Sequence, residues 1–313
     1  MLVAAAVVVL LLLAWFGWPL LSPEPGYGGR TLSSWLRQLD DGDYSHGLSW
    51  MAWHFERSAI QEEAAAAIRQ MGTNSLPFLL RSITNQDSRL VAKLNDFLEK
   101  RKWSWRAIII RQQGPTHGGF WIPADGRRRE AALAFEVLGP VARPAVPQLE
   151  NALTNSPAGP KDAALALAGI GPEGYAALTR TIVNWQANND WPGMCAVWAL
   201  AAHHASAPGM IDAIVGVVTN RSSSEAGMSC WALGELRQEP QRVVPLLIAS
   251  LQSSNSEPRW GASLGLANFG TNAASAVPAL IQALNDSDAT VRTRAQEALK
   301  TIDPAAAKRA GVK

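Results

Sequence analysis

The sequence is poor in the residue types and motifs that usually reveal an activity. In 313 residues it has two cysteines, five histidines and three tyrosines, and charged residues make up 17% of the chain. The net charge of +2 argues against a protein devoted as a whole to nucleic acid or to other polyanions. No HExxH or P-loop motif occurs and no GxGxxG follows a predicted strand, so we expect no catalytic residue, no cofactor and no metal.

The segment Met1 to Leu21 carries no charged side chain. At 1.5 Å per helical residue, such a run can cross the roughly 30 Å hydrocarbon core of a bilayer, and Trp15 and Trp18 near its end suit the headgroup zone. We interpret residues 1–21 as an uncleaved membrane anchor. A removed signal segment is the alternative, although no basic residue precedes the run and no convincing cleavage site follows it. The rest of the chain is then extracytoplasmic on a single-pass anchor, or secreted or periplasmic after cleavage.

Two apolar registers with one common period run through the second half of the chain. The first consists of leucines in short Ala-rich segments, spaced by a 33-residue period: Leu167, Leu200, Leu233, Leu266 and Leu299. The second runs alongside it with the same spacing: Trp185, Val218, Leu251 and Leu284. Two apolar stripes with one period predict a two-helix unit copied along the chain, which is an all-α solenoid.

Glycine and proline mark the helix boundaries within these units. Gly72 is followed by Pro77, Gly139 by Pro147 and Gly270 by Pro278, the usual order of Gly at a helix end and Pro at a helix start. Counting back by the period leaves room for an insert at about residues 97–127. Cys195 and Cys230 lie in successive repeats and are expected to be small buried residues, with a disulfide or a reactive or metal-binding role as alternatives.

The sequence also predicts how the chain is divided into segments. Residues 22–30 are rich in Pro and Gly and predict a linker. Residues 31–56 open with apolar residues at helical spacing and are expected to cap the array. The repeat domain then covers residues 57–304, and residues 305–313 are a small basic tail expected to lack regular structure, because Asp303-Pro304 stops the preceding helix.

The last unit resembles a HEAT repeat. Its segment LIQALNDSDATVRTRAQEALKTI has an Asp-bearing turn followed by Val-Arg and spaced alanines before a leucine, and the matching residues are Asp288, Val291, Arg292, Ala295, Ala298 and Leu299. GRRREAALAFEVLG is similar, and Arg259 keeps the arginine position in another unit. The resemblance covers roughly residues 57–302 and implies a HEAT-like α-α superhelix of about six two-helix repeats. The apolar N-terminus also resembles that of membrane-attached bacterial HEAT-repeat proteins of undefined role.

The insert is basic and aromatic. Between Lys100 and Arg129 the chain has eight basic residues against one acid, interleaved with tryptophans. Arg and Trp often anchor interfaces, and basic residues beside aromatic rings also suit anionic surfaces. The alternative is that these residues pack locally and have no partner. The candidate contacts in this segment are Arg101, Lys102, Trp103, Trp105, Arg106, Trp121 and Arg127.

A solenoid offers a long concave surface, so we expect a non-catalytic scaffold that binds a protein partner while its N-terminus holds it at the membrane. The predicted contacts on the inner helix row are Arg180, Asn184, Asp212 and Gln282. Two alternatives remain open: an adaptor to anionic surfaces through the insert, or an enzyme of the HEAT-like lyase or DNA glycosylase type. A nucleic-acid partner is not expected.

Overall fold

In the computed structural model, the described residues are 24–40, 58–84, 124–156, 160–185, 190–220 and 223–312. They are helical apart from one hairpin, whose two strands have two residues each, and the connecting turns. The chain divides into two compact units, unit 1 (residues 1–145) and unit 2 (residues 146–313). The expectation of an all-α repeat fold is therefore confirmed for this part of the chain.

Unit 1 opens with a hairpin where the sequence predicts only a linker. Strand β1 (Gly26–Tyr27) pairs antiparallel with β2 (Arg30–Thr31). The two residues between the strands are Gly28 and Gly29, with φ of +58° and +75°. A two-residue turn that matches the twist of the strands needs positive φ at both positions, which glycine adopts without strain.

The cap helix has the predicted apolar face. Helix α2 (Leu32–Leu39) buries Leu32, Trp35, Leu36 and Leu39, and it packs on helices α3 (Ala59–Met71) and α7 (Ala124–Leu138). Apolar residues at this spacing fall on one side of a helix, so burying that side orients α2. The predicted continuation of the cap, residues 41–56, lies outside the described residues.

The first repeat of unit 1 has Gly72 and Pro77 at the predicted boundary between its two helices. Ser58 caps α3 in a capping box with Gln61, and Gly72 ends α3 with φ +52°. A short 3-10 turn, η2 (Gly72–Ser75), leads into α4 (Leu76–Thr84), with Pro77 in its first turn. The same order returns after α7, with η3 (Gly139–Ala145) beginning at Gly139, also at φ +52°.

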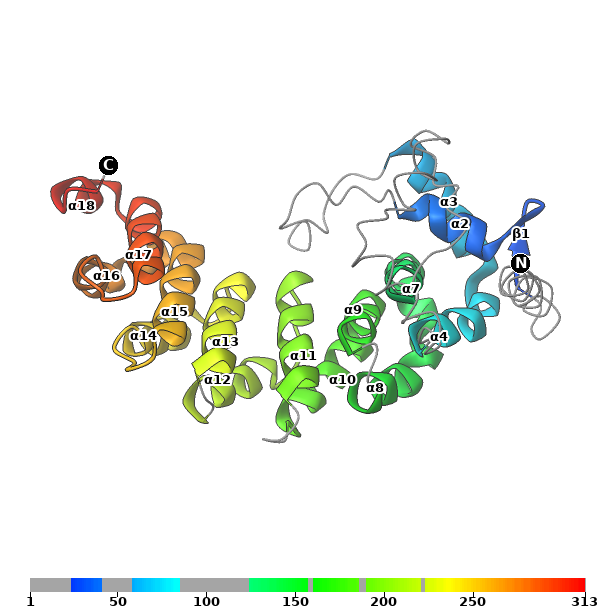
Figure 1. The fold of residues 1–313 in the computed structure, drawn as a ribbon, viewed down its shortest axis with the longest axis horizontal. Helices are drawn as coiled ribbons and strands as arrows, with labels where there is room; N and C mark the ends of the chain where they lie inside the picture. The colour runs from blue at the N-terminus through cyan, green and yellow to red at the C-terminus, as the bar shows by residue number, and fades with distance from the viewer. Residues whose placement is uncertain are drawn as a thin grey trace, which may run out of the picture. The chain divides into compact units, whose positions relative to one another are not determined.

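Unit 2 is a stack of helix pairs arranged in two rows (Figure 1). The first-helix row consists of α9 (Pro160–Ile170), α11 (Asp190–Ala202), α13 (Ser223–Leu236), α15 (Ser256–Phe269) and α17 (Ala289–Ile302). The second-helix row consists of α8 (Val146–Asn155), α10 (Pro172–Val183), α12 (Met210–Asn220), α14 (Pro240–Ser250) and α16 (Val277–Ala283), the last preceded by η4 (Gly270–Ala276). Successive helices of the first-helix row pack on one another.

The periodic leucine register forms the core between the rows. All five of its leucines have no solvent exposure, and they lie one on each helix of the first-helix row. Trp185 and Leu251 of the second register are buried at the ends of second helices. The two-helix repeat predicted from this period is thus confirmed in unit 2.

Two neighbouring first helices approach with their backbones in contact. A Cβ added to Gly227 of α13 would lie 2.6 Å from the carbonyl oxygen of Glu257 on α15. One added to Gly265 of α15 would lie 2.5 Å from the carbonyl oxygen of Cys230 on α13, and one on Gly234 would overlap the Gly265 backbone. Only glycine fits at these positions, so no side chain separates α13 from α15 there.

The HEAT arginine closes the turn between repeats. Arg259 of α15 makes a bidentate ion pair with Asp286, at 2.7 Å to each carboxylate oxygen, and also donates to the carbonyl oxygens of Ser253 and Ser254. Arg292, at the same position of the next repeat, donates to the carbonyl oxygens at the equivalent place in the next turn. Each arginine thus satisfies the backbone acceptors of a turn while it fixes the following helix.

The tail differs from the expectation. Residues after Asp303 form α18 (Pro304–Arg309), which packs on α17 and buries Ala306 and Ala307. Asp303 caps this helix through the backbone N–H of Ala306, and Pro304 is its first residue. Proline ends the preceding helix as expected, but it is also favoured at a helix start, and two small residues then allow close packing. Among the described helices none is long and apolar enough to span a membrane, and residues 1–21 lie outside that part.

Candidate functional site

Most of the predicted contacts in the insert lie outside the described residues: Arg101, Lys102, Trp103, Trp105, Arg106 and Trp121. Arg127 is described, in the first turn of α7, with its side chain half-buried. The interaction surface predicted for this segment therefore stays a prediction.

The four predicted contacts in unit 2 all lie on the second-helix row and are exposed. Arg180 on α10 makes an ion pair with Glu150 on α8, at 3.0 Å. Asp212 on α12 makes one with Arg242 on α14, at 2.6 Å. Both pairs join second helices of neighbouring repeats, so the charges of Arg180 and Asp212 are already engaged within the unit.

The two other predicted contacts, Asn184 and Gln282, lie at the end of α10 and near the end of α16. They show no shared cavity or common contact with the first two residues in the described structure. The four side chains therefore share one row of helices but are not gathered into one compact site.

The opposite side of unit 2 carries a stronger pattern, which sequence reasoning missed. Positions two, five and six residues before each core leucine point away from the second-helix row, because helical residues turn by about 100° each. We call these positions the first-helix face. On α11, α13 and α15 the face has nine positions without a charge: Met194, Cys195, Trp198, Gly227, Met228, Trp231, Trp260, Gly261 and Leu264.

The end helices of the row differ at the same positions. The face is Lys161, Asp162 and Leu165 on α9, and Thr293, Arg294 and Glu297 on α17. The first-helix face is thus apolar and aromatic in its middle and charged at both ends. The signal was available in the sequence: Leu165, Trp198, Trp231 and Leu264 repeat at the same period as the core leucines.

Two of the three tryptophans of this face, Trp198 and Trp231, are buried and held by specific contacts. The Trp198 ring is 8% exposed and lies 5.3 Å from the Lys161 ammonium, within the range of a cation–π contact. The Trp231 ring is 5% exposed, and its indole N–H donates to Glu235 Oε1 at 3.0 Å. The Asn268 amide donates to the same oxygen at 2.8 Å, which links α13 to α15.

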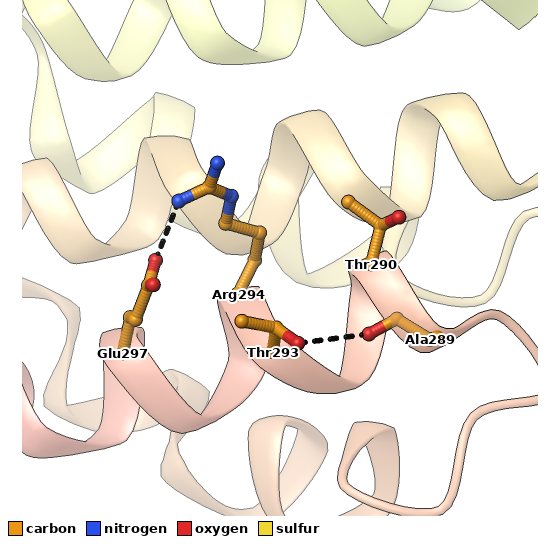
Figure 2. Close-up of a pocket in the computed structure, with 5 residues that line it drawn as sticks. All are labelled: Ala289, Thr290, Thr293, Arg294 and Glu297. Carbon is orange, nitrogen blue, oxygen red and sulfur yellow. Dashed lines mark hydrogen bonds and ion pairs between the residues drawn. The ribbon is translucent and has the colours of Figure 1, made fainter.

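At its α17 end the face has a shallow polar hollow of about 310 Å³. Figure 2 shows its five lining residues, all from α17: Ala289, Thr290, Thr293, Arg294 and Glu297. The Arg294 guanidinium makes an ion pair with Glu297 at 2.7 Å, and the Thr293 hydroxyl donates to the carbonyl oxygen of Ala289. A guanidinium neutralised by its neighbour, in an open hollow on one helix, is a polar border of the face rather than a substrate pocket.

One catalytic-looking pattern occurs within the repeats. Gly261–Gly265 spell Gly-Ala-Ser-Leu-Gly, the GxSxG of nucleophile elbows, in which the serine sits exposed on a sharp turn between a strand and a helix. Here Ser263 lies inside α15, is fully buried, and its hydroxyl donates to the carbonyl oxygen of Arg259 at 2.9 Å. The pattern therefore reflects helix packing, and Ser263 is not a nucleophile.

The two cysteines are free and buried. Burial raises the pKa of the Cys195 thiol to about 12 and that of Cys230 to about 11. Both thiols are thus protonated at neutral pH and poorly reactive. Within the described ranges no group of three His, Cys, Asp or Glu side chains could hold a metal ion.

Part of unit 2 matches a known family of repeats. Residues 211–300 match the model of the HEAT repeats family. Similar solved structures include a designed armadillo repeat protein in complex with the peptide (KR)4, at 19% identity and a TM-score of 0.41, covering 73% of this chain and 99% of that one. An engineered protein of known crystal structure has 18% identity and a TM-score of 0.37, covering 87% of this chain and 96% of that one. No curated protein matches the sequence. Residues 211–300 thus match HEAT repeats, and the two-row stack, the periodic leucine core and the turn arginines make unit 2 an all-α solenoid of repeated helix pairs.

Proposed function

We propose that this chain is a non-catalytic scaffold that binds a protein partner through the first-helix face of unit 2, while residues 1–21 hold it at a membrane with the repeats on the extracytoplasmic side. One observation carries the choice of surface: the nine face positions on α11, α13 and α15 have no charge and include four half-buried apolar side chains, between charged positions on α9 and α17.

The physical argument concerns what a solenoid needs for its own stability. The core leucines already bury one side of each first helix against the second-helix row. The opposite side can be polar without loss of packing, as it is on α17, where Thr293, Arg294 and Glu297 occupy it. Four apolar side chains there, Met194, Met228, Trp260 and Leu264, are only half-buried and leave apolar atoms open to solvent in the free protein. Contiguous apolar surface of this kind in soluble proteins marks an interaction site.

The composition of the face fits a protein interface. Tryptophan and methionine are enriched where partners meet, and charged residues are depleted in the core of such interfaces. Trp198 and Trp231 are buried and fixed, whereas Met194, Met228, Trp260 and Leu264 are half-buried and present apolar atoms to solvent. The fixed rings would form the floor of the interface, and the half-buried side chains would contact the partner.

Backbone contact between α13 and α15 supports a concave shape for this face. Helices separated only by glycines are more closely spaced than helices separated by larger side chains. A two-row stack bends toward its more closely spaced row, so we place the concave surface at the first-helix row. Arg180, Asn184, Asp212 and Gln282 would then lie on the other side, as a second candidate surface.

The test is a crosslinking pull-down from native membranes with matched truncations of apolar side chains. The Met228→Ala and Trp260→Ala double variant removes contacts from the first-helix face, and Ile281→Ala is the control, because Ile281 is an exposed apolar residue of the second-helix row. Loss of about 2 kcal/mol, a typical cost at an interface anchor, lowers partner affinity about 30-fold.

The expected result is loss of the crosslinked partner with the double variant and retention with Ile281→Ala. Equal recovery with both variants rejects the first-helix face. If the partner is lost with a variant that combines Asn184→Ala and Gln282→Ala, but is retained with the Met228→Ala and Trp260→Ala variant, binding is assigned to the second-helix row instead. A chain that lacks residues 99–126 tests the insert separately: loss of the partner with this deletion alone transfers the site to the insert.

A further inference from the structure

The β1–β2 hairpin follows closely on the charge-free run. Tyr27 in β1 is the sixth residue after Leu21, the end of that run. A fully extended chain covers at most about 3.5 Å per residue, so Tyr27 lies within about 20 Å of the end of the run. If residues 1–21 span a bilayer, the hairpin lies at the surface of that bilayer.

The hairpin is fixed to α2 by contacts from several directions. The backbone N–H of Leu32 donates to the carbonyl oxygen of Pro25 at 2.9 Å. The indole N–H of Trp35 donates to the carbonyl oxygen of Tyr27 at 3.2 Å, and the Arg30 guanidinium lies 3.9 Å from the centre of the Trp35 ring. Because the hairpin and α2 are joined in this way, residues 24–39 form one rigid element, which we call the foot.

The outer surface of this foot has the chemistry of a headgroup contact. The Tyr27 side chain is 47% exposed, and tyrosine rings favour the zone between hydrocarbon and water. Ser34 and Arg37 are both outside the buried face of α2, and Arg30 of β2 donates to the Ser34 hydroxyl at 3.2 Å. Guanidinium groups bind phosphate oxygens through paired N–H donors.

The acids of the same region are engaged elsewhere. Glu24 accepts a hydrogen bond from the backbone N–H of Ser33. Asp40, at the far end of α2, lies 3.4 Å from Arg129 of α7 in an ion pair. Glu24 keeps its negative charge, because a hydrogen bond from a neutral amide does not remove it, and Arg37 also acts electrostatically on the buried Glu130 of α7. Arg30 and Arg37 therefore give the foot a small excess of positive charge toward a flat anionic surface.

We propose that the hairpin and the outer side of α2 rest on the anionic phospholipid headgroups of the membrane that holds residues 1–21, with Tyr27, Arg30 and Arg37 as the contacting residues. This inference rests on the membrane attachment in the proposed function. It gives that attachment a second element, which orients α2 and the helices packed on it at the membrane surface. Two basic residues at such a surface add an attraction that weakens as salt screens it.

The test uses the full chain reconstituted in vesicles of phosphatidylcholine, with and without phosphatidylglycerol. A fluorophore is attached to Thr31→Cys in the hairpin or, as a matched control, to Thr154→Cys on α8; both threonines are exposed. The native cysteines can stay, because they are buried and protonated. A nitroxide quencher on the lipid headgroup then reports which label lies near the surface, and flotation of the vesicles reports attachment.

We expect the label at residue 31 to be quenched at least twofold more than the label at residue 154. The Tyr27→Ser and Arg30→Gln double variant should lower that quenching in phosphatidylglycerol vesicles while the protein still floats. Equal quenching of the two labels in protein that floats overturns the foot and leaves the anchor standing. Protein that does not float overturns the membrane attachment itself, and with it this inference. A double variant quenched as strongly as the parent rejects the named residues.

Discussion

Replacing Glu130 with glutamine probes the electrostatics of unit 1. Glu130 lies in α7 with 6% of its surface exposed. Burial raises its pKa from 4.5 to about 7, and the Asp40 carboxylate adds to the rise. The guanidinium groups of Arg37, Arg127 and Arg129 act in the opposite direction but do not compensate. A glutamate therefore stays largely protonated up to neutral pH next to a cluster of charges.

The sign and the size of the effect follow from this pKa. Below pH 4.5 Glu130 is protonated in both the folded and the unfolded chain, so its ionisation costs the folded state nothing. Between pH 4.5 and about 7 the unfolded chain releases its proton while the folded chain keeps it, and the free energy of unfolding falls with rising pH. The rise from 4.5 to about 7 corresponds to about 3 kcal/mol, lost in full above neutral pH.

The assay compares urea unfolding of the parent and of Glu130→Gln between about pH 4 and about pH 8. Glutamine cannot ionise, so the stability of the variant relative to the parent should increase by about 3 kcal/mol across this range, whatever the substitution costs at low pH. Hydrogen exchange of the α7 amides, followed by mass spectrometry, assigns the change to unit 1. Two stability curves that stay parallel from low to high pH would refute the reasoning.

Three further predictions concern unit 2. Arg259→Ala should lower the free energy of unfolding by about 3 kcal/mol, because it leaves the Asp286 carboxylate, whose side chain is only 10% exposed, without its partner. The control Arg242→Ala removes an exposed ion pair and should leave the urea midpoint unchanged. Gly234→Ala should destabilise by about 1–3 kcal/mol through overlap with α15, whereas Gly216→Ala, with free space inside α12, should stabilise by up to about 1 kcal/mol; urea unfolding measures both. The two native cysteines should react with a thiol reagent at pH 8 only after unfolding, as absorbance of the released product will show, because burial raises their pKa values.

Features that depend on burial at a fixed period were predictable from the sequence. The core leucines had to be buried because a two-helix unit places each of them at the same point of the stack, and all five are. Gly72 and Gly270 end helices at positive φ as expected, since few other residues adopt that conformation. Such signals are local or strictly periodic, so one sequence is enough to find them.

Features that depend on which elements meet were not predicted. Pro304 starts a helix because Asp303 caps it and α17 offers a surface for two alanines, and neither fact is visible in a tail of small residues. Glu130 looks like a solvated acid in the segment RRREAAL, and only the packing of α2 on α7 buries it beside Asp40. The sequence suggested Arg180 and Asp212 as contacts for a partner, whereas the structure pairs them with Glu150 and Arg242 of neighbouring repeats. Both pairs have the same separation along the chain, so this spacing was a signal that could have been found in the sequence.

The glycine contacts between α13 and α15 also determine how unit 2 can deform under load. Side chains between two helices act as compliant spacers, because they can change rotamer while the backbones slide. Between α13 and α15 there is backbone against backbone, with no spacer to adjust. This joint is therefore stiffer than one separated by side chains, and flexing of the solenoid around a bound partner should fall on junctions of the second kind, such as the one where the Trp185 ring packs against Gly193. Under a force along unit 2, α13 and α15 should therefore keep their relative position, and most of the deformation should occur between the neighbouring repeats.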